Sequence, residues 1–234
     1  MTNGLENDTA AVIVAAGRGR RAGGEIAKQW QEVAGARVID HTLHAFRSHP
    51  AISQIVLVLA ADDLSETFDG VLTTGGGANR AQSVKAGLEV LAAPPHGRVP
   101  SQVLIHDVAR PCISASAIDA VIATLDTAPG AALALPVTDA LWRGTDGFVT
   151  GTPDRSGLFR AQTPQGFHFD KILAAHRAND ADAADDVAVA RAAGIDVAMV
   201  PGSEENLKIT HPPDFDRAAR ILETLHGHQA RQRI

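Results

Sequence analysis

The chain has 234 residues and a formal net charge of −6, with 21 Lys and Arg against 27 Asp and Glu. This acidic balance argues against a protein whose whole surface binds nucleic acid or an anionic membrane. A single cysteine, Cys112, excludes a disulfide framework and a zinc site built from several thiolates. The apolar content is too high for disorder, and no apolar run approaches the ~20 residues of a membrane-spanning helix. We therefore expect a soluble, cytoplasmic globular protein.

Short β-branched runs alternate with alanine-rich helical stretches, a pattern typical of a mostly parallel sheet covered by helices. In the first part of the chain we expect strands at residues 10–14, 55–59, 71–73 and 103–105. We expect helices at residues 38–48, 80–91 and 114–125, where apolar side chains recur at helical spacing. The loop at residues 17–24 is too rich in glycine and arginine to form either element.

The second part of the chain continues the alternation but contains one segment of different character. After a strand at 131–135, residues 138–152 hold two short strands around a glycine-containing turn, which indicates an inserted β-hairpin. The remaining expected elements are helices at 170–179, 184–193 and 214–225 and strands at 197–200 and 207–209. We predict a single α/β domain over residues 1–226, with residues 227–234 as a frayed tail or linker.

The loop at residues 17–24 carries the first chemical signal. It matches the dinucleotide pattern G-x-G-x-x-A, which would indicate an oxidoreductase, but two further glycines interrupt the helix that this motif requires. A P-loop fits less well, because Glu25 stands where Lys followed by Ser or Thr is needed. Glycine N–H groups together with Arg21 and Lys28 favour a triphosphate-binding loop, and a solvated basic turn is the structural alternative.

A second glycine-rich segment covers residues 75–83 and leads into a predicted helix. Its glycines are followed by Arg80 and Ser83 at the helix start, an arrangement that favours binding of an anion or of the edge of a base. The structural alternative is an ordinary strand-to-helix turn in which Asn79 caps the helix.

The third segment is the end of the strand at residues 103–105, which leads into His106 and Asp107. A carboxylate at the carboxyl end of a parallel strand lies where ligands bind in open α/β sheets. Asp107 would suit Mg²⁺ there, because this ion takes one or two carboxylates together with substrate phosphates. The structural alternative is a helix-capping Asp107 that pairs with Arg110.

Four aspartates gather before the helix expected at residues 184–193, and they are Asp180, Asp182, Asp185 and Asp186. Such a cluster could bind a cation. We expect instead a solvated helix start, because carboxylates interact favourably with the dipole at a helix N-terminus.

Several short motifs follow one another along the chain. They are Ala15-Ala16-Gly17-x-Gly19-x-Arg21, Lys28-Gln29, Gly76-Gly77-x-x-Arg80-x-x-Ser83, His106-Asp107-x-Ala109-Arg110-Pro111, Asp154-Arg155-x-Gly157-Leu158, Gln162-Thr163-Pro164-Gln165 and Asn206-x-Lys208-Ile209-Thr210. In this order and at this spacing, the chain resembles the 2-C-methyl-D-erythritol 4-phosphate cytidylyltransferases of the non-mevalonate isoprenoid pathway. The resemblance covers residues 10–225, which is nearly the whole chain.

The resemblance implies a Rossmann-like nucleotidyltransferase fold, with a mostly parallel sheet and an inserted β-arm at about residues 138–154 that pairs two subunits into a homodimer. The residues it implies as catalytic are Arg21 and Lys28, which would stabilise charge on the CTP α-phosphate, and Arg155 and Lys208, which would position the substrate phosphate. The implied nucleotide-binding residues are Ala15, Ala16, Gly17, Gly77, Arg80 and Ser83. Asp107, Arg110 and Thr163 are implied to bind the substrate, and Asp107 also to bind Mg²⁺ or another divalent cation.

The implied reaction joins CTP and 2-C-methyl-D-erythritol 4-phosphate to give 4-diphosphocytidyl-2-C-methyl-D-erythritol and pyrophosphate. The substrate phosphate attacks the α-phosphate of CTP in line. Because that phosphate is already ionised at neutral pH, the reaction requires no general base, and the lack of a Ser/His/Asp or Cys/His set is expected. Cations and Mg²⁺ would hold the two anions together and neutralise the charge that builds up in the transition state.

The chain departs from the family's usual pattern at Ala78, Asn79, Ala140, Trp142 and Ala184, positions that flank the implied sugar-phosphate pocket. A ribitol 5-phosphate cytidylyltransferase, whose motifs are closely similar, is therefore an alternative function. A nucleotide-binding module that has lost catalysis is another alternative. Some relatives continue into a fused second enzyme domain, to which residues 227–234 would suit a linker.

Overall fold

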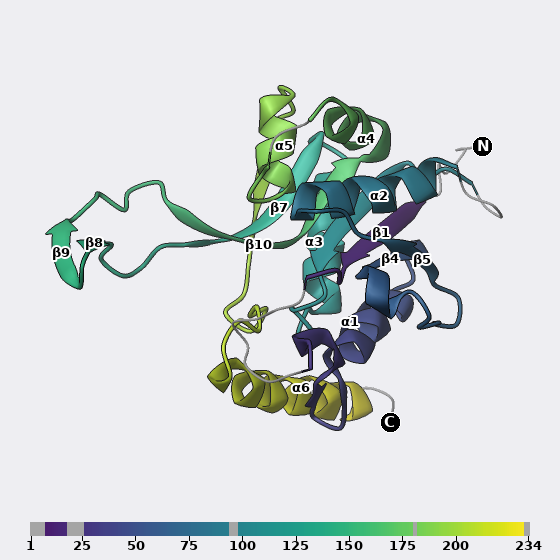
Figure 1. Ribbon diagram of the computed structural model, residues 1–234, viewed down its shortest axis with the longest axis horizontal. Coiled ribbons are helices and arrows are strands. Elements are labelled where there is room, and N and C mark those ends of the chain that lie inside the picture. Colours follow the sequence, from purple (N-terminus) through teal and green to yellow (C-terminus); the bar gives the residue numbers. More distant parts are fainter. Residues whose placement is uncertain (1–7, 18–25, 94–97, 180–181, 232–234) are drawn as a thin grey trace.

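A seven-stranded sheet lies at the centre of the computed structural model, which describes residues 8–17, 26–93, 98–179 and 182–231. The strands of this sheet are β1 (Thr9–Val14), β4 (Ile52–Leu59), β5 (Leu72–Gly75), β6 (Gln102–Asp107), β7 (Gly130–Pro136), β10 (Phe159–His168) and β11 (Ala198–Pro201). They lie in the order β11-β7-β10-β6-β1-β4-β5 (Figure 1). Within this sheet β10 alone is antiparallel to its neighbours, so the predicted mostly parallel sheet is confirmed.

Helices cover both faces of the sheet (Figure 1). One face carries α2 (Arg80–Ala92), α4 (Phe169–Ala178) and α5 (Asp186–Ala192), and the other carries α1 (Val38–Arg47) and α3 (Ala115–Thr124). Val12 of β1 belongs to the apolar cluster on the first face, and its neighbour Ile13 to the cluster on the second. Because both faces are covered, β1 reads as an unbroken apolar run rather than an alternating one.

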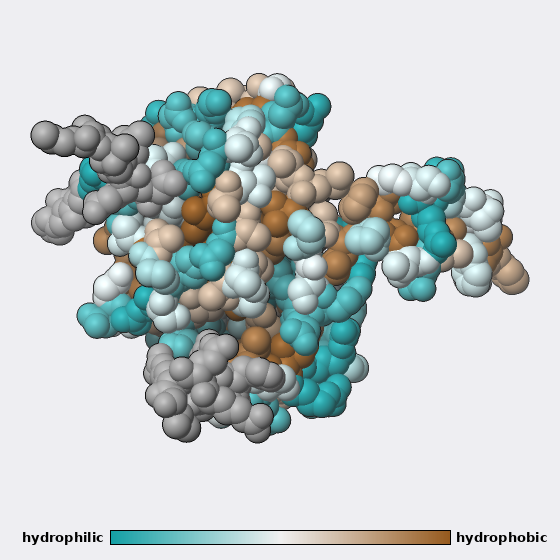
Figure 2. All heavy atoms as spheres, turned by 180° about the vertical axis from the view of Figure 1, so that it is seen from behind, coloured by the Kyte–Doolittle hydropathy of each residue, from teal (hydrophilic) through white to brown (hydrophobic). Residues whose placement is uncertain are grey.

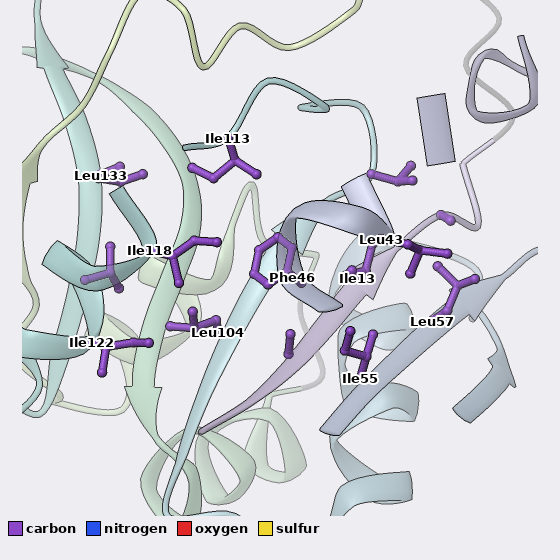
Figure 3. Close-up of a cluster of buried hydrophobic side chains, with 14 of the residues drawn as sticks. Ile13, Leu43, Phe46, Ile55, Leu57, Leu104, Ile113, Ile118, Ile122 and Leu133 are labelled. Atoms are coloured by element: carbon purple, nitrogen blue, oxygen red, sulfur yellow. The ribbon is translucent and has the colours of Figure 1, made fainter. Parts of the chain in front are cut away.

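The core between the sheet and helices α1 and α3 consists of large apolar side chains. Phe46 of α1 lies among them with Ile13 of β1 and Leu104 of β6 (Figure 3). All three side chains are fully buried. Burial of each such side chain stabilises the fold by about 1.5–3 kcal/mol. The strands whose ends form the candidate site are thereby held firmly in place.

The last helix, α6 (Pro213–Arg231), lies outside these layers, beside the two-stranded ribbon of β2 (Glu32–Val33) and β3 (Ala36–Arg37) (Figure 1). Two short 3₁₀ turns, η2 (Lys28–Trp30) and η3 (Ala61–Asp63), complete the described elements. Val33 and Leu222 are buried together in a third apolar cluster with Ile209. Ile209 donates its N–H to the Ala109 carbonyl (2.8 Å). The segment before α6 is therefore tied to the loop after β6.

Between β7 and β10 the chain leaves the sheet as an arm, whose tip is the hairpin of β8 (Arg143–Thr145) and β9 (Phe148–Gly151) (Figure 1). The φ angles of Asp146 (51°) and Gly147 (83°) suit a tight two-residue turn, for which Asp-Gly is a favoured pair. Trp142 and Phe148 are 69% and 77% exposed. Figure 2 shows hydrophobic residues on this arm, which projects away from the body of the protein. The predicted inserted hairpin is confirmed.

The structure differs from the expected elements at four places, of which the first is the ribbon of β2 and β3, which the sequence pattern does not predict. Residues 207–209 form no strand, because the hydrogen bond to the Ala109 carbonyl does not extend into a ladder. The sequence pattern does not predict β10, because Pro164 within it lacks an N–H for the hydrogen bonds between strands. Around this proline, between Ala161 and Gln165, the pairing register of β10 with β7 shifts. α6 continues to Arg231 instead of ending at residue 225, in keeping with the high helix propensity of Gln, Ala and Arg. None of the described helices is long and apolar enough to cross a membrane.

Candidate active site

A cavity of about 280 Å³ opens at the carboxyl ends of the parallel strands β1 and β6. The predicted site residues that line it are Ala15, Ala16, Gly17, Lys28, Gly77, Arg80, Ser83, Asp107 and Lys208. Ligands of open α/β sheets bind at this edge, and the volume is close to the lower end of the range for small-molecule sites. The fold thus brings together residues from segments that are far apart in the sequence.

The loop after β1 is fixed to η2, which carries Lys28. The Ala15 carbonyl accepts a hydrogen bond from the buried side-chain amide of Gln29 (3.1 Å). The ammonium group of Lys28 donates to the Ile209 carbonyl (2.9 Å), which fixes this cation at the cavity wall. A Cβ added at Gly17 would meet no atom of the described residues within 4 Å, so these residues leave a ligand room to approach this part of the backbone.

The glycine-rich loop before α2 is folded back onto the first turn of the helix. Asn79 caps α2, since its side chain accepts the N–H of Gln82 (2.9 Å). The Ser83 hydroxyl donates to the Asn79 carbonyl (2.9 Å) and accepts the N–H of Gly77 (3.1 Å). The alternative of an Asn79-capped turn is therefore confirmed. The turn also forms one wall of the cavity, so the structural and ligand-binding interpretations are compatible.

Asp107 lies between two cations at the end of β6. Its Oδ1 accepts from Arg80 Nε (3.2 Å) and its Oδ2 accepts from Lys208 Nζ (2.6 Å). Burial alone would raise the pKa of Asp107, but Arg80 and Lys208 lower it well below its usual value. Burial would likewise lower the pKa of Arg80, but Asp186 and Asp107 raise it. Asp107 and Arg80 therefore stay charged, and the Asp107 carboxylate holds two basic side chains at the cavity.

Arg110 is buried, and it does not form the ion pair with Asp107 that the structural alternative required. Its guanidinium donates instead to the Asn206 carbonyl (2.7 Å) and the Ala161 carbonyl (3.3 Å). It lines a second cavity of about 230 Å³, to which Arg160, Lys208 and Arg217 also contribute. Because Lys208 lines both cavities, the two are neighbours that share one cation.

Thr163 lines neither cavity, and it contacts the segment that carries Asp107. His106 places Nε2 3.1 Å from the Arg110 carbonyl and Nδ1 3.1 Å from the Thr163 hydroxyl. Burial lowers the pKa of His106 to about 4, so the ring is neutral at physiological pH. A carbonyl only accepts, so Nε2 carries the proton and Nδ1 accepts from Thr163. The Thr163 oxygen in turn accepts the N–H of Asp107 (3.1 Å), which fixes the position of that residue.

Two predicted catalytic residues are not placed in either cavity. Arg21 lies outside the described residues, as do the other arginines of its loop. Arg155 is exposed on the arm segment between β9 and β10 and lines neither of the two cavities. The structure of one chain therefore does not bring Arg155 to the other site residues.

The donors available to a divalent cation are few. Asp107 is the only acidic residue among the described residues that line the first cavity, and both of its oxygens contact cations. Among the described residues, no group of three or more His, Cys, Asp or Glu side chains could hold a metal ion. The described residues that line this cavity therefore offer Mg²⁺ one carboxylate, and Arg80 and Lys208 already contact both of its oxygens.

Sequence reasoning missed one charged residue next to this site. The predicted helix start is confirmed, since the half-buried Asp185 caps α5, but solvation is wrong for Asp186, whose side chain is fully buried. Asp182 is exposed before the helix, and Asp180 lies outside the described residues. The Oδ2 of Asp186 lies 2.8 Å from Arg80 Nη1. The signal was the helical spacing, since Asp186 shares a face with the buried Val189 and Ala190.

The sequence and the fold of this chain are similar to those of known proteins. A sequence profile of the family described as 2-C-methyl-D-erythritol 4-phosphate cytidylyltransferase matches residues 9–224. A protein of that name from Cereibacter sphaeroides is 54% identical, over 94% of this chain and 99% of its own length. The "Bifunctional enzyme IspD/IspF" of Ruegeria pomeroyi is 56% identical, over 92% of this chain and 56% of its own length. A crystal structure of 4-diphosphocytidyl-2C-methyl-D-erythritol synthase is 31% identical with a TM-score of 0.80, over 93% of this chain and 100% of that one. The chain therefore belongs to the family of 2-C-methyl-D-erythritol 4-phosphate cytidylyltransferases.

Proposed function

We propose that the chain joins CTP and 2-C-methyl-D-erythritol 4-phosphate, with release of pyrophosphate. The observation that carries this proposal is the arrangement of Lys28, Arg80 and Lys208 around one cavity, with Asp107 between two of them. Two phosphorylated anions repel each other, and fixed cations at a single site overcome that repulsion. The activity named for relatives that share more than half of this chain's residues supports the same conclusion. These cations argue against a module that has lost catalysis.

The reaction needs positioning and charge neutralisation rather than acid–base chemistry. An oxygen of the sugar phosphate forms a bond to the α-phosphorus of CTP, and the bond from that phosphorus to the bridging oxygen of the β-phosphate breaks. The leaving group is pyrophosphate. We assign Lys28 and Arg21 to the charge that develops on the α-phosphate. Lys28 is supported by its place on the cavity wall, and Arg21 by its position in the loop that follows β1.

The first cavity is the proposed nucleotide site. Its walls are the loop with Ala15, Ala16 and Gly17 and the loop with Gly77, Arg80 and Ser83. Backbone groups of such glycine loops can approach phosphate oxygens and the edge of a base closely. Ser83 acts in this site by folding the Gly77 loop, because its hydroxyl already bonds within the loop. Arg80 supplies positive charge at the same wall.

The second cavity is the proposed site of the sugar phosphate. Lys208, which lines both cavities, would lie between the attacking phosphate and CTP. Arg110 borders this second cavity, while Thr163 acts indirectly by holding Asp107. Asp107 lines the first cavity next to Lys208, and because a carboxylate oxygen can accept more than one hydrogen bond, it can also accept from the hydroxyl groups of the substrate while it keeps Lys208 in reach of the phosphate.

Mg²⁺ would supply further neutralisation of the triphosphate. Asp107 fits poorly as its ligand, because Arg80 and Lys208 occupy both carboxylate oxygens. A divalent cation here would take its ligands mainly from phosphate and water, as Mg²⁺ commonly does. We therefore assign no step of the reaction to a protein-bound metal.

We further propose that the arm pairs two chains into a homodimer and carries Arg155 into the partner's site. The arm exposes large apolar side chains, including Trp142 and Phe148, that a partner would cover. Arg155 lies on the same arm and away from the cavities of its own chain. Mixed dimers that combine one Arg155→Ala chain with one Lys208→Ala chain test this. Such a dimer has one complete site if Arg155 acts across the interface, and none if Arg155 acts within its own chain. Activity that recovers on mixing supports the proposal, and two inactive variants that stay inactive contradict it.

The test of the proposed function is pyrophosphate release from CTP and the sugar phosphate, with Lys28→Ala as the variant. Lys171 of α4 is exposed on the surface, so Lys171→Ala is the matched control. We expect Lys28→Ala to lower kcat by roughly 10²- to 10³-fold, as removal of one preorganised donor does. Loss of the hydrogen bond to the Ile209 carbonyl should cost only about 1 kcal/mol of unfolding free energy, so the variant stays folded. Equal turnover of the two variants would contradict the role of Lys28. We also propose a cytoplasmic location, where CTP is available.

A further inference from the structure

A second carboxylate holds Arg80 from the side opposite the cavity. Asp186 is the first residue of α5, and its side chain is fully buried. Its Oδ2 lies 2.8 Å from Arg80 Nη1, while Arg80 Nε contacts Asp107 at 3.2 Å. Asp107 lines the cavity and Asp186 does not. The guanidinium is therefore fixed between one carboxylate that a ligand can reach and one that it cannot.

Asp186 is itself held by groups from two other elements. Its Oδ1 lies 3.1 Å from Nε2 of His176, a buried residue of α4. The side-chain oxygen of Gln165, on β10, accepts the N–H groups of Asp186 (3.0 Å) and Val187 (3.1 Å). The Gln165 amide also donates to Asp185 (3.0 Å). A carboxylate fixed in this way can define the position of its partner cation.

The contact between Asp186 and Arg80 can keep Arg80 in position when a ligand binds at Asp107. A substrate group that engages Asp107 would compete with Arg80 and Lys208 for the two carboxylate oxygens, which both of these side chains contact in this structure. A long arginine side chain with no other partner would then gain rotamer freedom, and ligand binding would have to restrict it again. The contact with Asp186 lies behind the cavity and survives the change. Arg80 is therefore pre-organised before and after substrate binding.

We propose that Asp186 is a positioning residue, which holds Arg80 at the nucleotide side of the cavity without touching the substrate. This inference rests on the proposed function, because it gives Arg80 a nucleotide to bind. It predicts that loss of the Asp186 charge weakens CTP binding through Arg80 alone. It also predicts that the loss has no separate effect once Arg80 is gone.

The test is a double-mutant cycle on the full chain, with CTP affinity measured by titration and kcat by pyrophosphate release. Asp186→Asn keeps the size of the side chain and removes its charge. We expect it to weaken CTP binding roughly tenfold, which is within the range for coupled neighbours. In an Arg80→Gln background, the same change should alter CTP affinity by less than about twofold. The control is Glu89→Gln, which removes an exposed carboxylate that pairs α2 with Arg177 of α4, and which should leave CTP affinity unchanged.

Unchanged CTP affinity in Asp186→Asn would overturn the inference. So would a tenfold loss that repeats in full in the Arg80→Gln background, because that result indicates a general structural role. If Asp186→Asn does not fold, two variants of His176 provide the test. His176→Gln keeps an amide that can donate to Asp186, so it should bind CTP as the wild type does. His176→Phe removes this donor and should bind CTP more weakly. Equal CTP affinity of these two variants would also overturn the inference. A wild-type chain that binds no CTP would instead refute the proposed function, so the two failures are distinguishable.

Discussion

Gly76 lies at the closest approach of the two loops that form the nucleotide site, which makes it a sensitive position for a test of that site. A Cβ added there would lie 2.4 Å from the Ala16 Cβ and 2.9 Å from the Ser83 hydroxyl oxygen. Ordinary contacts of a Cβ begin at 3.4 Å, so the two loops would have to separate by about 1 Å. Gly75 is a matched control one residue earlier, because its Cβ would meet only Leu64, at 3.6 Å.

We expect Gly76→Ala to lower kcat/KM for CTP by roughly 100-fold, the loss that a 1 Å displacement at a reaction site can cause. Overpacking should also cost about 1–3 kcal/mol of unfolding free energy, which corresponds to a fall of a few degrees in Tm. Gly75→Ala should stay near wild type in both measurements. The assays are pyrophosphate release at varied CTP concentration and thermal unfolding without ligand.

Two results would contradict the claim that the loops meeting at Gly76 form the CTP site. Equal kcat/KM values for Gly75→Ala and Gly76→Ala would show that the spacing of the two loops does not matter to CTP. A loss that appears only at varied sugar phosphate, with CTP kinetics unchanged, would show that the first cavity is not the nucleotide site.

Two further predictions concern the segment that carries Asp107. Thr163→Val leaves the Asp107 N–H without its acceptor, so urea unfolding should show that the free energy of unfolding falls by about 1–3 kcal/mol. Thr163→Ser keeps the hydroxyl and should retain most of the stability. Equal free energies of unfolding for the two variants would contradict the hydrogen bond between Asp107 and Thr163. His106 has a pKa lowered from 6.5 to about 4. Below pH 6.5 His106 is therefore protonated in the unfolded chain but stays neutral in the folded chain down to about pH 4. The free energy of unfolding should fall by about 3 kcal/mol as the pH drops from 6.5 to 4. His106→Gln should flatten this dependence of unfolding free energy on pH, and an unchanged slope would contradict the assignment.

Much of the candidate site could be predicted from the sequence, because its residues follow strands that are easy to recognise. The run that forms β1 and the turn before α2 are local patterns, and glycines, a capping Asn79 and charged residues mark the ends of such elements. Parallel strands place those ends at one edge of a sheet, so Gly17, Arg80 and Asp107 were expected to meet. The cavity that they line follows from the fold class.

The parts that could not be predicted depend on tertiary contacts. Asp186 is hydrophilic and stands beside a solvated capping residue, yet α5 turns its side chain inward to meet Arg80 of another helix. Thr163 was expected at the substrate, but it lies on β10, where its hydroxyl oxygen accepts the N–H of Asp107. Because Pro164 is unusual within a strand, the sequence pattern does not predict β10. Arg110 was expected to border the substrate pocket, but the backbone carbonyls that hold its guanidinium come from segments distant in the sequence. No local pattern contains these partners.

The most direct test of the central claim is a comparison of sugar phosphates with the full chain, CTP and Mg²⁺. Pyrophosphate release is measured with 2-C-methyl-D-erythritol 4-phosphate and, in parallel, with ribitol 5-phosphate. Ala140 and Ala184 depart from the usual family pattern near the proposed pocket, which makes the choice of acceptor the sharpest question. We expect turnover with 2-C-methyl-D-erythritol 4-phosphate and little with ribitol 5-phosphate. Turnover with ribitol 5-phosphate alone would contradict this expectation.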